Sequence, residues 1–137
     1  MGVVMVFQRF AAATAVASAA IALATIVVLL APRAVFERVH PITTLWCFVP
    51  FVWGLWALIT PSSWMPKRLP LWGAILGLIG GCLGVFVLNL PARFFGGELP
   101  LLARAAAVLV VAVFYYALWM LVRAAYGLLP VVPEKRE

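Results

Sequence analysis

The chain has 137 residues, of which 67% are hydrophobic and 10% charged, with a formal net charge of +6 at pH 7 and a mean hydropathy of +1.17. Soluble domains are about 45–50% apolar and about 25% charged, so the composition excludes an ordinary soluble globule. The basic residues are dispersed among apolar runs, which argues against a nucleic-acid partner. Several apolar runs reach the roughly 20 residues that a helix needs to cross a bilayer. We therefore expect an all-α, polytopic integral membrane protein, a compact antiparallel bundle of four transmembrane helices.

The first expected span covers residues 10–31 and ends before Pro32, because proline disfavours helix at the residue that precedes it. Its apolar run is longer than the roughly 7–15 residues of a signal-peptide core, so we expect a span and not a cleaved signal. Small residues fall on one face of this helix, at Ala11, Ala15, Ser18 and Ala22.

The second expected span covers residues 42–60, after a polar stretch at 33–41 that could form a short interfacial helix. Pro50 lies near its centre and predicts a kink there. The rings of Trp46, Trp53 and Trp56 share a side of the helix. They could stack on a quinone tail, a carotenoid or a chlorin, but we favour contacts with lipid or helix packing. No intrinsic cofactor is predicted, although bound lipid, quinone or pigment is compatible with this face.

The third expected span, residues 71–90, contains the stretch GAILGLIGGCLG with five glycines. Each glycine costs a water-exposed helix about 1 kcal/mol relative to alanine, so packing must explain them. One face of the helix carries Gly73, Gly77, Gly80 and Gly84. In lipid, small residues let helix backbones approach closely, and we expect this face to cross the small-residue face of the first span. Packing against a second chain is the alternative that the sequence leaves open.

The fourth expected span covers residues 101–126, so a single transmembrane domain occupies residues 1–129 and a short charged tail occupies 130–137. Four spans place both ends of the chain on one side, with the basic residues Arg9, Lys67, Arg68, Arg123, Lys135 and Arg136. The other side holds fewer, namely Arg33, Arg38, Arg93 and Arg104. The positive-inside rule then predicts cytoplasmic termini, and the short loops are typical of a bacterial inner membrane protein.

Residues that could carry chemistry are few. No acidic residue falls within an expected span, and the sequence contains no recognisable catalytic triad, phosphate loop or metal-ligand cluster. The single histidine, His40, precedes the second span and reads as an interfacial hydrogen-bonding residue. Arg93 and Arg104 flank one loop, where they snorkel to headgroups, hold an anionic lipid phosphate or carboxylate, or pair with Glu98. We predict no catalytic residue and no metal site.

Three functions remain open. We favour a non-catalytic accessory or scaffolding subunit of a larger membrane complex, which contacts lipids and other membrane subunits, or further copies of itself, through its helix faces. The alternative is a small oligomeric transporter or channel for a neutral or lipid-like substrate along the glycine face. The third is a membrane enzyme acting on lipid, with Arg93, Arg104 and His40 near the headgroups.

Overall fold

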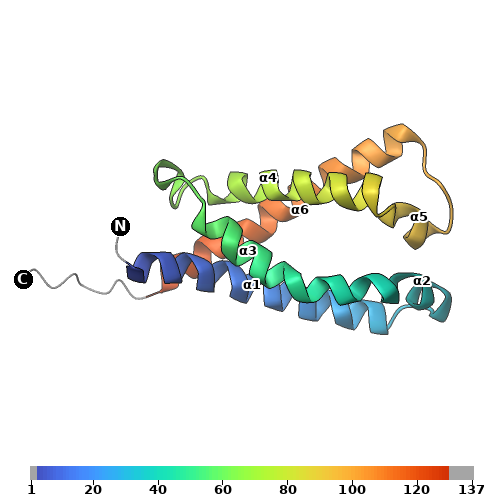
Figure 1. The fold of residues 1–137 in the computed structure, drawn as a ribbon, viewed down its shortest axis with the longest axis horizontal. Coiled ribbons are helices and arrows are strands. Elements are labelled where there is room, and N and C mark those ends of the chain that lie inside the picture. Colours follow the sequence, from blue (N-terminus) through green and yellow to red (C-terminus); the bar gives the residue numbers. More distant parts are fainter. Residues whose placement is uncertain (1–2, 130–137) are drawn as a thin grey trace, which may run out of the picture.

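The computed structural model describes residues 3–129, and this range contains helices and turns but no strand (Figure 1). Four helical segments are long and apolar enough to cross a membrane: Val4–Leu29, Arg33–Leu58, Leu69–Val87 and Leu101–Leu128. The all-helical class and the number of candidate spans are therefore confirmed. The tail expected at 130–137 lies outside the described residues.

The first and fourth spans are single helices, α1 (Val3–Leu29) and α6 (Leu101–Leu128). The second is composite, with α2 (Arg33–Thr43), a 3-10 turn (Thr44–Phe48) and α3 (Val49–Leu58) in direct succession. We expected a kink at Pro50, but the irregular 3-10 turn lies just before this residue. Pro50 itself occupies the first turn of α3, where its missing N–H is tolerated. The span also begins at residue 33 and not at 42, so Glu37, which we expected outside any span, lies in its first helix.

The third span ends differently from expectation. Helix α4 (Leu69–Cys82) passes into a π-helical turn (Leu83–Val87), in which the Leu88 N–H bonds the Leu83 carbonyl at 3.0 Å. Asn89 then adopts a left-handed conformation with φ +48° and reverses the chain. The stretch that we expected to be a turn forms the short helix α5 (Leu90–Phe95), which ends at Gly96 with φ +78°. A left-handed residue is the usual way to end a helix and redirect the backbone.

The long helices form two antiparallel pairs, α1 with α3 and α4 with α6, and the crossing of α1 and α6 joins the pairs (Figure 1). This arrangement corrects the expected crossing of the first and third spans, since α4 packs along α6. The shared core lies where the pairs meet. Its buried members are Ala12, Ala13, Ala17, Trp53, Ala57, Leu69, Leu76, Trp119 and Val122.

The glycines of α4 explain why α4 pairs with α6. A Cβ atom added at Gly73 would overlap the root of the Trp119 side chain, and one added at Gly77 would lie 2.7 Å from the Tyr115 Cβ. At Gly81 the nearest atom is a methyl carbon of Val108, at 3.3 Å. We call Gly73, Gly77 and Gly81 the glycine seam. They let the α4 backbone approach α6 closely, as small residues do in membrane helix pairs.

Two of the glycines assigned to this face by sequence lie elsewhere. Gly80 is exposed, with no atom within 4 Å of the place where its Cβ would be. Gly84 is buried, but it faces the Leu90 side chain of α5, 3.0 Å from the position of a Cβ. The seam therefore repeats every four residues through Gly81, because the i, i+4, i+8 row of α4 follows α6 in this crossing.

The small-residue face of α1 is also not the face that packs. The four residues expected at the contact are all exposed: Ala11, Ala15, Ser18 and Ala22. The chain instead buries Ala12, Ala13 and Ala17. With 3.6 residues per turn, the two sets point about 180° apart. Both faces are rich in small residues, so composition could not distinguish them.

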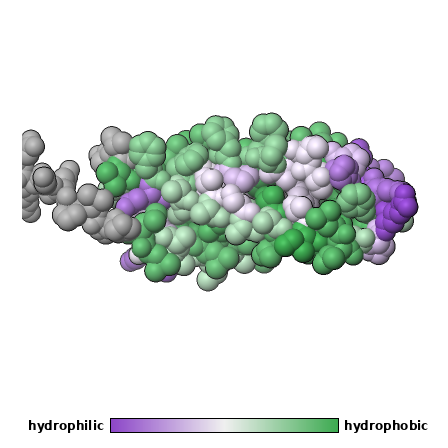
Figure 2. Space-filling view, turned by 90° about the horizontal axis from the view of Figure 1, so that it is seen from below, coloured by the Kyte–Doolittle hydropathy of each residue, from purple (hydrophilic) through white to green (hydrophobic). Residues whose placement is uncertain are grey.

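The outer surface has an apolar middle and polar ends. Figure 2 shows broad hydrophobic areas over the middle of the molecule and hydrophilic residues gathered toward the two ends. One end, formed by α2, α5 and the beginning of α6, carries Arg33, Glu37, Arg38, His40, Arg93, Glu98 and Arg104. This division is the one expected for a protein whose middle faces hydrocarbon and whose ends face headgroups and water.

Candidate functional site

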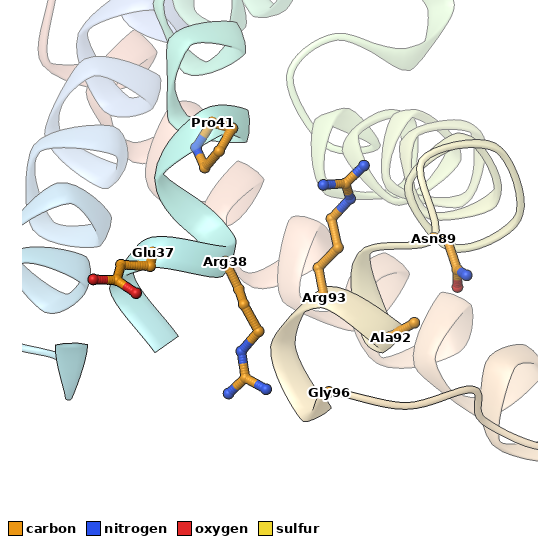
Figure 3. Close-up of a pocket in the computed structure, with 7 residues that line it drawn as sticks. All are labelled: Glu37, Arg38, Pro41, Asn89, Ala92, Arg93 and Gly96. Atoms are coloured by element: carbon orange, nitrogen blue, oxygen red, sulfur yellow. The ribbon is translucent and has the colours of Figure 1, made fainter. Parts of the chain in front are cut away.

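The α2–α5 end gathers charged and polar side chains from several parts of the chain. The reversal at Asn89 folds α5 back, so that it lies against α2, more than fifty positions earlier in the sequence. Between them is a cavity of about 530 Å³ (Figure 3). It is lined by Glu37, Arg38, Pro41, Asn89, Ala92, Arg93 and Gly96.

Two arginines from different helices extend into this space. Arg38 comes from α2 and Arg93 from α5, and their guanidinium groups point toward opposite ends of the space between the helices (Figure 3). The Arg93 Nε donates a hydrogen bond to the Leu88 carbonyl at 3.4 Å, which fixes the base of its guanidinium. The Arg38 guanidinium lies against Gly96, where a Cβ atom would overlap it. We call Arg38 and Arg93 the arginine pair.

The glutamates nearby are engaged by other residues. Glu37 accepts a hydrogen bond from the Arg33 Nε at 2.8 Å, one turn earlier on α2. Glu98 accepts from the Asn89 amide at 2.7 Å and forms an ion pair with Arg104. These contacts bind the loop after α5 to the first turn of α6. They leave the arginine pair without a carboxylate partner among residues 3–129.

The opposite face of α5 borders a second cavity, also of about 530 Å³, whose lining is almost entirely apolar. It lies between α5 and the helices α4 and α6, beside the π-helical turn. Its walls include Gly80, Gly81 and Gly84 on one side, Leu90 and Phe94 on α5, and Val111 on α6. Helix α5 therefore separates a cationic cavity from an apolar one.

The tryptophans of the second span do not form the outward aromatic face that their spacing suggested. Trp53 is only 2% exposed and packs against Trp119 and Tyr115, with ring centroids 5.5 and 5.2 Å away. Trp56 stacks on Trp72 at 4.8 Å, while Trp46 is half-buried. Trp53 therefore follows the helix-packing alternative that the sequence favoured, and its buried ring offers no surface to a pigment or quinone.

The stacked tryptophans also exchange hydrogen bonds. The Trp56 Nε1 donates to the Trp72 carbonyl at 2.9 Å, and the Trp72 Nε1 donates to the Trp56 carbonyl at 3.0 Å. Trp64 packs edge-on against Trp72, and the Arg68 guanidinium lies 5.8 Å from the Trp64 ring centroid. This cluster ties α3 to α4 around their connecting loop. Nothing in the sequence spacing pointed to the reciprocal bonds.

The remaining predicted site residues are not brought together. His40 is exposed and contacts only the Phe36 ring among aromatic neighbours, at 5.0 Å. Arg104 pairs with Glu98, as one of the alternatives from the sequence proposed. Of His40, Arg93 and Arg104, only Arg93 lines the cationic cavity. Arg38, which does line it, was treated in the sequence only as an indicator of orientation.

One buried charge was also missed. Arg9 is only 4% exposed within α1, and its Nη1 donates to the Thr60 carbonyl at 3.3 Å. Thr60 lies just beyond the end of α3, where a carbonyl has no partner within the helix. Only the pairing of α1 with α3 makes this bond possible, so sequence position alone could not reveal it.

The fold and these contacts define a class, a helical protein with four candidate membrane spans, two helix pairs and a cationic cavity at one end. Comparison of the chain with known protein families, with curated proteins and with solved structures gave no match. The function has to be inferred from the residues themselves.

Proposed function

We propose that the protein is a non-catalytic accessory or scaffolding subunit of a larger membrane complex. The observation that supports this most directly is how few residues of each span the chain itself buries. In the most apolar 18-residue window of each span, 22%, 17%, 39% and 22% of the residues are buried, in chain order. The remaining surface is available to lipid and to other subunits.

The exposed face of α1 is the part of this surface best suited to another helix. Ala11, Ala15, Ser18 and Ala22 follow one row along α1, opposite the residues that it buries. Membrane helices associate chiefly by close backbone packing, which such a row permits. The same row gives lipid chains fewer side-chain atoms to contact than a leucine-rich face would.

Isolation from the native membrane tests the proposal. We expect the protein, extracted in mild detergent and analysed by native mass spectrometry, to carry different polypeptides. The double substitution Ala15→Leu with Ala22→Leu should release them, because added bulk separates the helices. A matched control makes the same two changes at Ala117 and Ala124, exposed on α6 at the same spacing.

A lone monomer or a pure homo-oligomer would contradict the proposal. So would equal loss of the partner in the α6 control, which would point to general damage.

The apolar cavity gives a specific reason to keep a second candidate, a small transporter for a lipid-like substrate. This cavity has a volume of about 530 Å³ and is lined in part by the exposed Gly80. Transfer of a fluorescent phospholipid between leaflets of proteoliposomes, faster than in protein-free vesicles and slowed by Gly80→Leu, would favour transport over the accessory role.

The proposed location is a bacterial inner membrane with both termini in the cytoplasm. Among the described residues each end carries four lysines or arginines: Arg9, Lys67, Arg68 and Arg123 at one, and Arg33, Arg38, Arg93 and Arg104 at the other. The excess of basic residues that predicts cytoplasmic termini therefore depends on Lys135 and Arg136, which follow the last span in the sequence. Labelling of an engineered cysteine in the loop at 62–68 from the cytoplasmic side tests this orientation.

A further inference from the structure

We propose that the arginine pair, Arg38 of α2 and Arg93 of α5, binds the phosphate group of an anionic membrane lipid. This site is independent of the accessory role, since it requires no partner subunit. It also differs from the pairing of Arg93 with Arg104 considered in the sequence, because Arg104 is held by Glu98.

The charges around the cavity favour an anion. Among the lining residues, Arg38 and Arg93 contribute two positive charges and Glu37 one negative charge, and Glu37 is bonded at 2.8 Å to Arg33, which lies outside the lining. The arginine pair thus shares a cavity of about 530 Å³ with no carboxylate bound to either member. Guanidinium groups bind phosphate oxygens through paired N–H donors. The two guanidinium groups point toward opposite ends of the cavity (Figure 3), so both reach one phosphate only when the exposed Arg38 side chain rotates toward Arg93.

Local structure orients Arg93 through a hydrogen bond and leaves space for Arg38. The Leu88 carbonyl that accepts from the Arg93 Nε is placed there by the left-handed turn at Asn89. Gly96 gives Arg38 its room, because any side chain at this position would occupy the space of the guanidinium. The absence of a Cβ atom at Gly96 therefore serves both the backbone, with φ +78°, and the arginine.

The surroundings favour a lipid over a free phosphate ion. The cavity lies at the α2–α5 end of the molecule, and Figure 2 shows hydrophilic residues gathered toward the ends, beyond the broad hydrophobic areas. With the apolar helices in a bilayer, such an end lies at the level of the lipid phosphates. Phe94 and Phe95 of the same short helix are exposed, and Phe94 lines the apolar cavity on the opposite face of α5. These exposed rings give the end of α5 an apolar surface next to the arginine pair, which suits a lipid better than a free ion.

Lipid titration by native mass spectrometry tests the proposal on the full-length protein. We expect phosphatidylglycerol to bind more tightly than phosphatidylcholine with the same acyl chains. Each of Arg38→Gln and Arg93→Gln should weaken phosphatidylglycerol binding about five-fold, and the double variant about 25-fold, from about 1 kcal/mol per basic residue. Arg123→Gln, at an exposed arginine near the other end, is the matched control and should change little.

Three outcomes would overturn the site. The double variant could bind phosphatidylglycerol like the wild type, the Arg123 control could lose as much affinity, or millimolar inorganic phosphate could displace the lipid completely. The last result would assign the cavity to a free phosphate. Unchanged circular dichroism and thermal unfolding of each variant confirm that the fold is intact, and Arg38→Lys should recover part of the affinity by restoring the charge.

Discussion

The two helix pairs are held together in different ways. Along α4 and α6, the glycine seam lets one backbone approach the roots of Trp119 and Tyr115, and Trp119 itself is fully buried. Along α1 and α3, contact is made through alanines and through polar side chains of α1, which reach the backbone carbonyls of Pro50 in α3 and of Thr60 just beyond it.

This difference determines how each pair can respond to change. At Gly73 the obstructing atoms are the Cγ, Cβ and Cδ1 of Trp119, and the Cβ cannot move without moving α6. At Gly54 of α3 the nearest atoms are the Phe10 ring edge, at 2.5 Å, and the Thr14 hydroxyl, at 2.8 Å. Rotation of these side chains can relieve a clash. We therefore expect the α4–α6 pair to be rigid and the α1–α3 pair to be adaptable.

The largest expected effect comes from Gly73→Ala. Overpacking of a close contact costs about 1–3 kcal/mol, and we expect the upper end of this range because rotation of the Trp119 side chain leaves its obstructing Cβ in place. Gly54→Ala should cost about 1 kcal/mol, since Phe10 is only partly buried and can move. The free energy of unfolding in mixed micelles, followed by tryptophan fluorescence, measures both.

Gly80→Ala is the control, because nothing lies within 4 Å of its Cβ position, and its effect should stay within about 0.5 kcal/mol. Equal costs at Gly54 and Gly73 would remove the contrast between the pairs.

The next effect is expected at Arg9. Arg9→Met keeps a long side chain but removes the donor to the Thr60 carbonyl, which leaves a buried acceptor without that bond. We expect a loss of about 1–3 kcal/mol in the same unfolding measurement. Arg123→Met, at an exposed arginine of α6, should be nearly neutral. A neutral Arg9→Met would show that the α1–α3 pair does not depend on this contact.

A smaller effect is expected when one of the two hydrogen bonds between Trp56 of α3 and Trp72 of α4 is removed. Trp72→Phe preserves a ring that can stack on Trp56 but removes the Nε1 donor to the Trp56 carbonyl. The expected cost is about 1 kcal/mol for the lost hydrogen bond. Trp46→Phe, at a half-buried tryptophan of the second span, serves as the control. Equal losses in the two variants would assign the effect to ring size.

The smallest effect is expected for Thr14→Val, which removes the hydroxyl that donates to the Pro50 carbonyl at 3.3 Å. Hydrogen bonds between membrane helices average about 0.6 kcal/mol, and the substitution keeps the side-chain shape. Thr25→Val is matched to it, because its hydroxyl bonds the Ile21 carbonyl of its own helix at 2.8 Å. A similar cost at both positions would mean that the bond between helices adds nothing.

The candidate site was only partly predictable. Arg93 was identified from its place beside a loop, and the pairing of Arg104 with Glu98 was among the alternatives considered. Arg38 was not identified as a site residue, because α2 lies beside α5 only after Asn89 turns the chain and α5 folds back. An asparagine next to a leucine-proline pair gives a weak signal for such a reversal, since asparagine tolerates positive φ better than most residues.

The sequence by itself determined the helical class and the four candidate spans, because runs of apolar residues of that length have few alternatives to helix in a bilayer. It also indicated that the glycines of the third span serve close packing. Only the tertiary structure decided that they pack on α6 and that α1 turns its other alanine face inward. Small residues permit close approach without specifying a partner. The partner helix is determined by two large side chains of α6, Trp119 and Tyr115, which fit the space that the glycines of α4 leave.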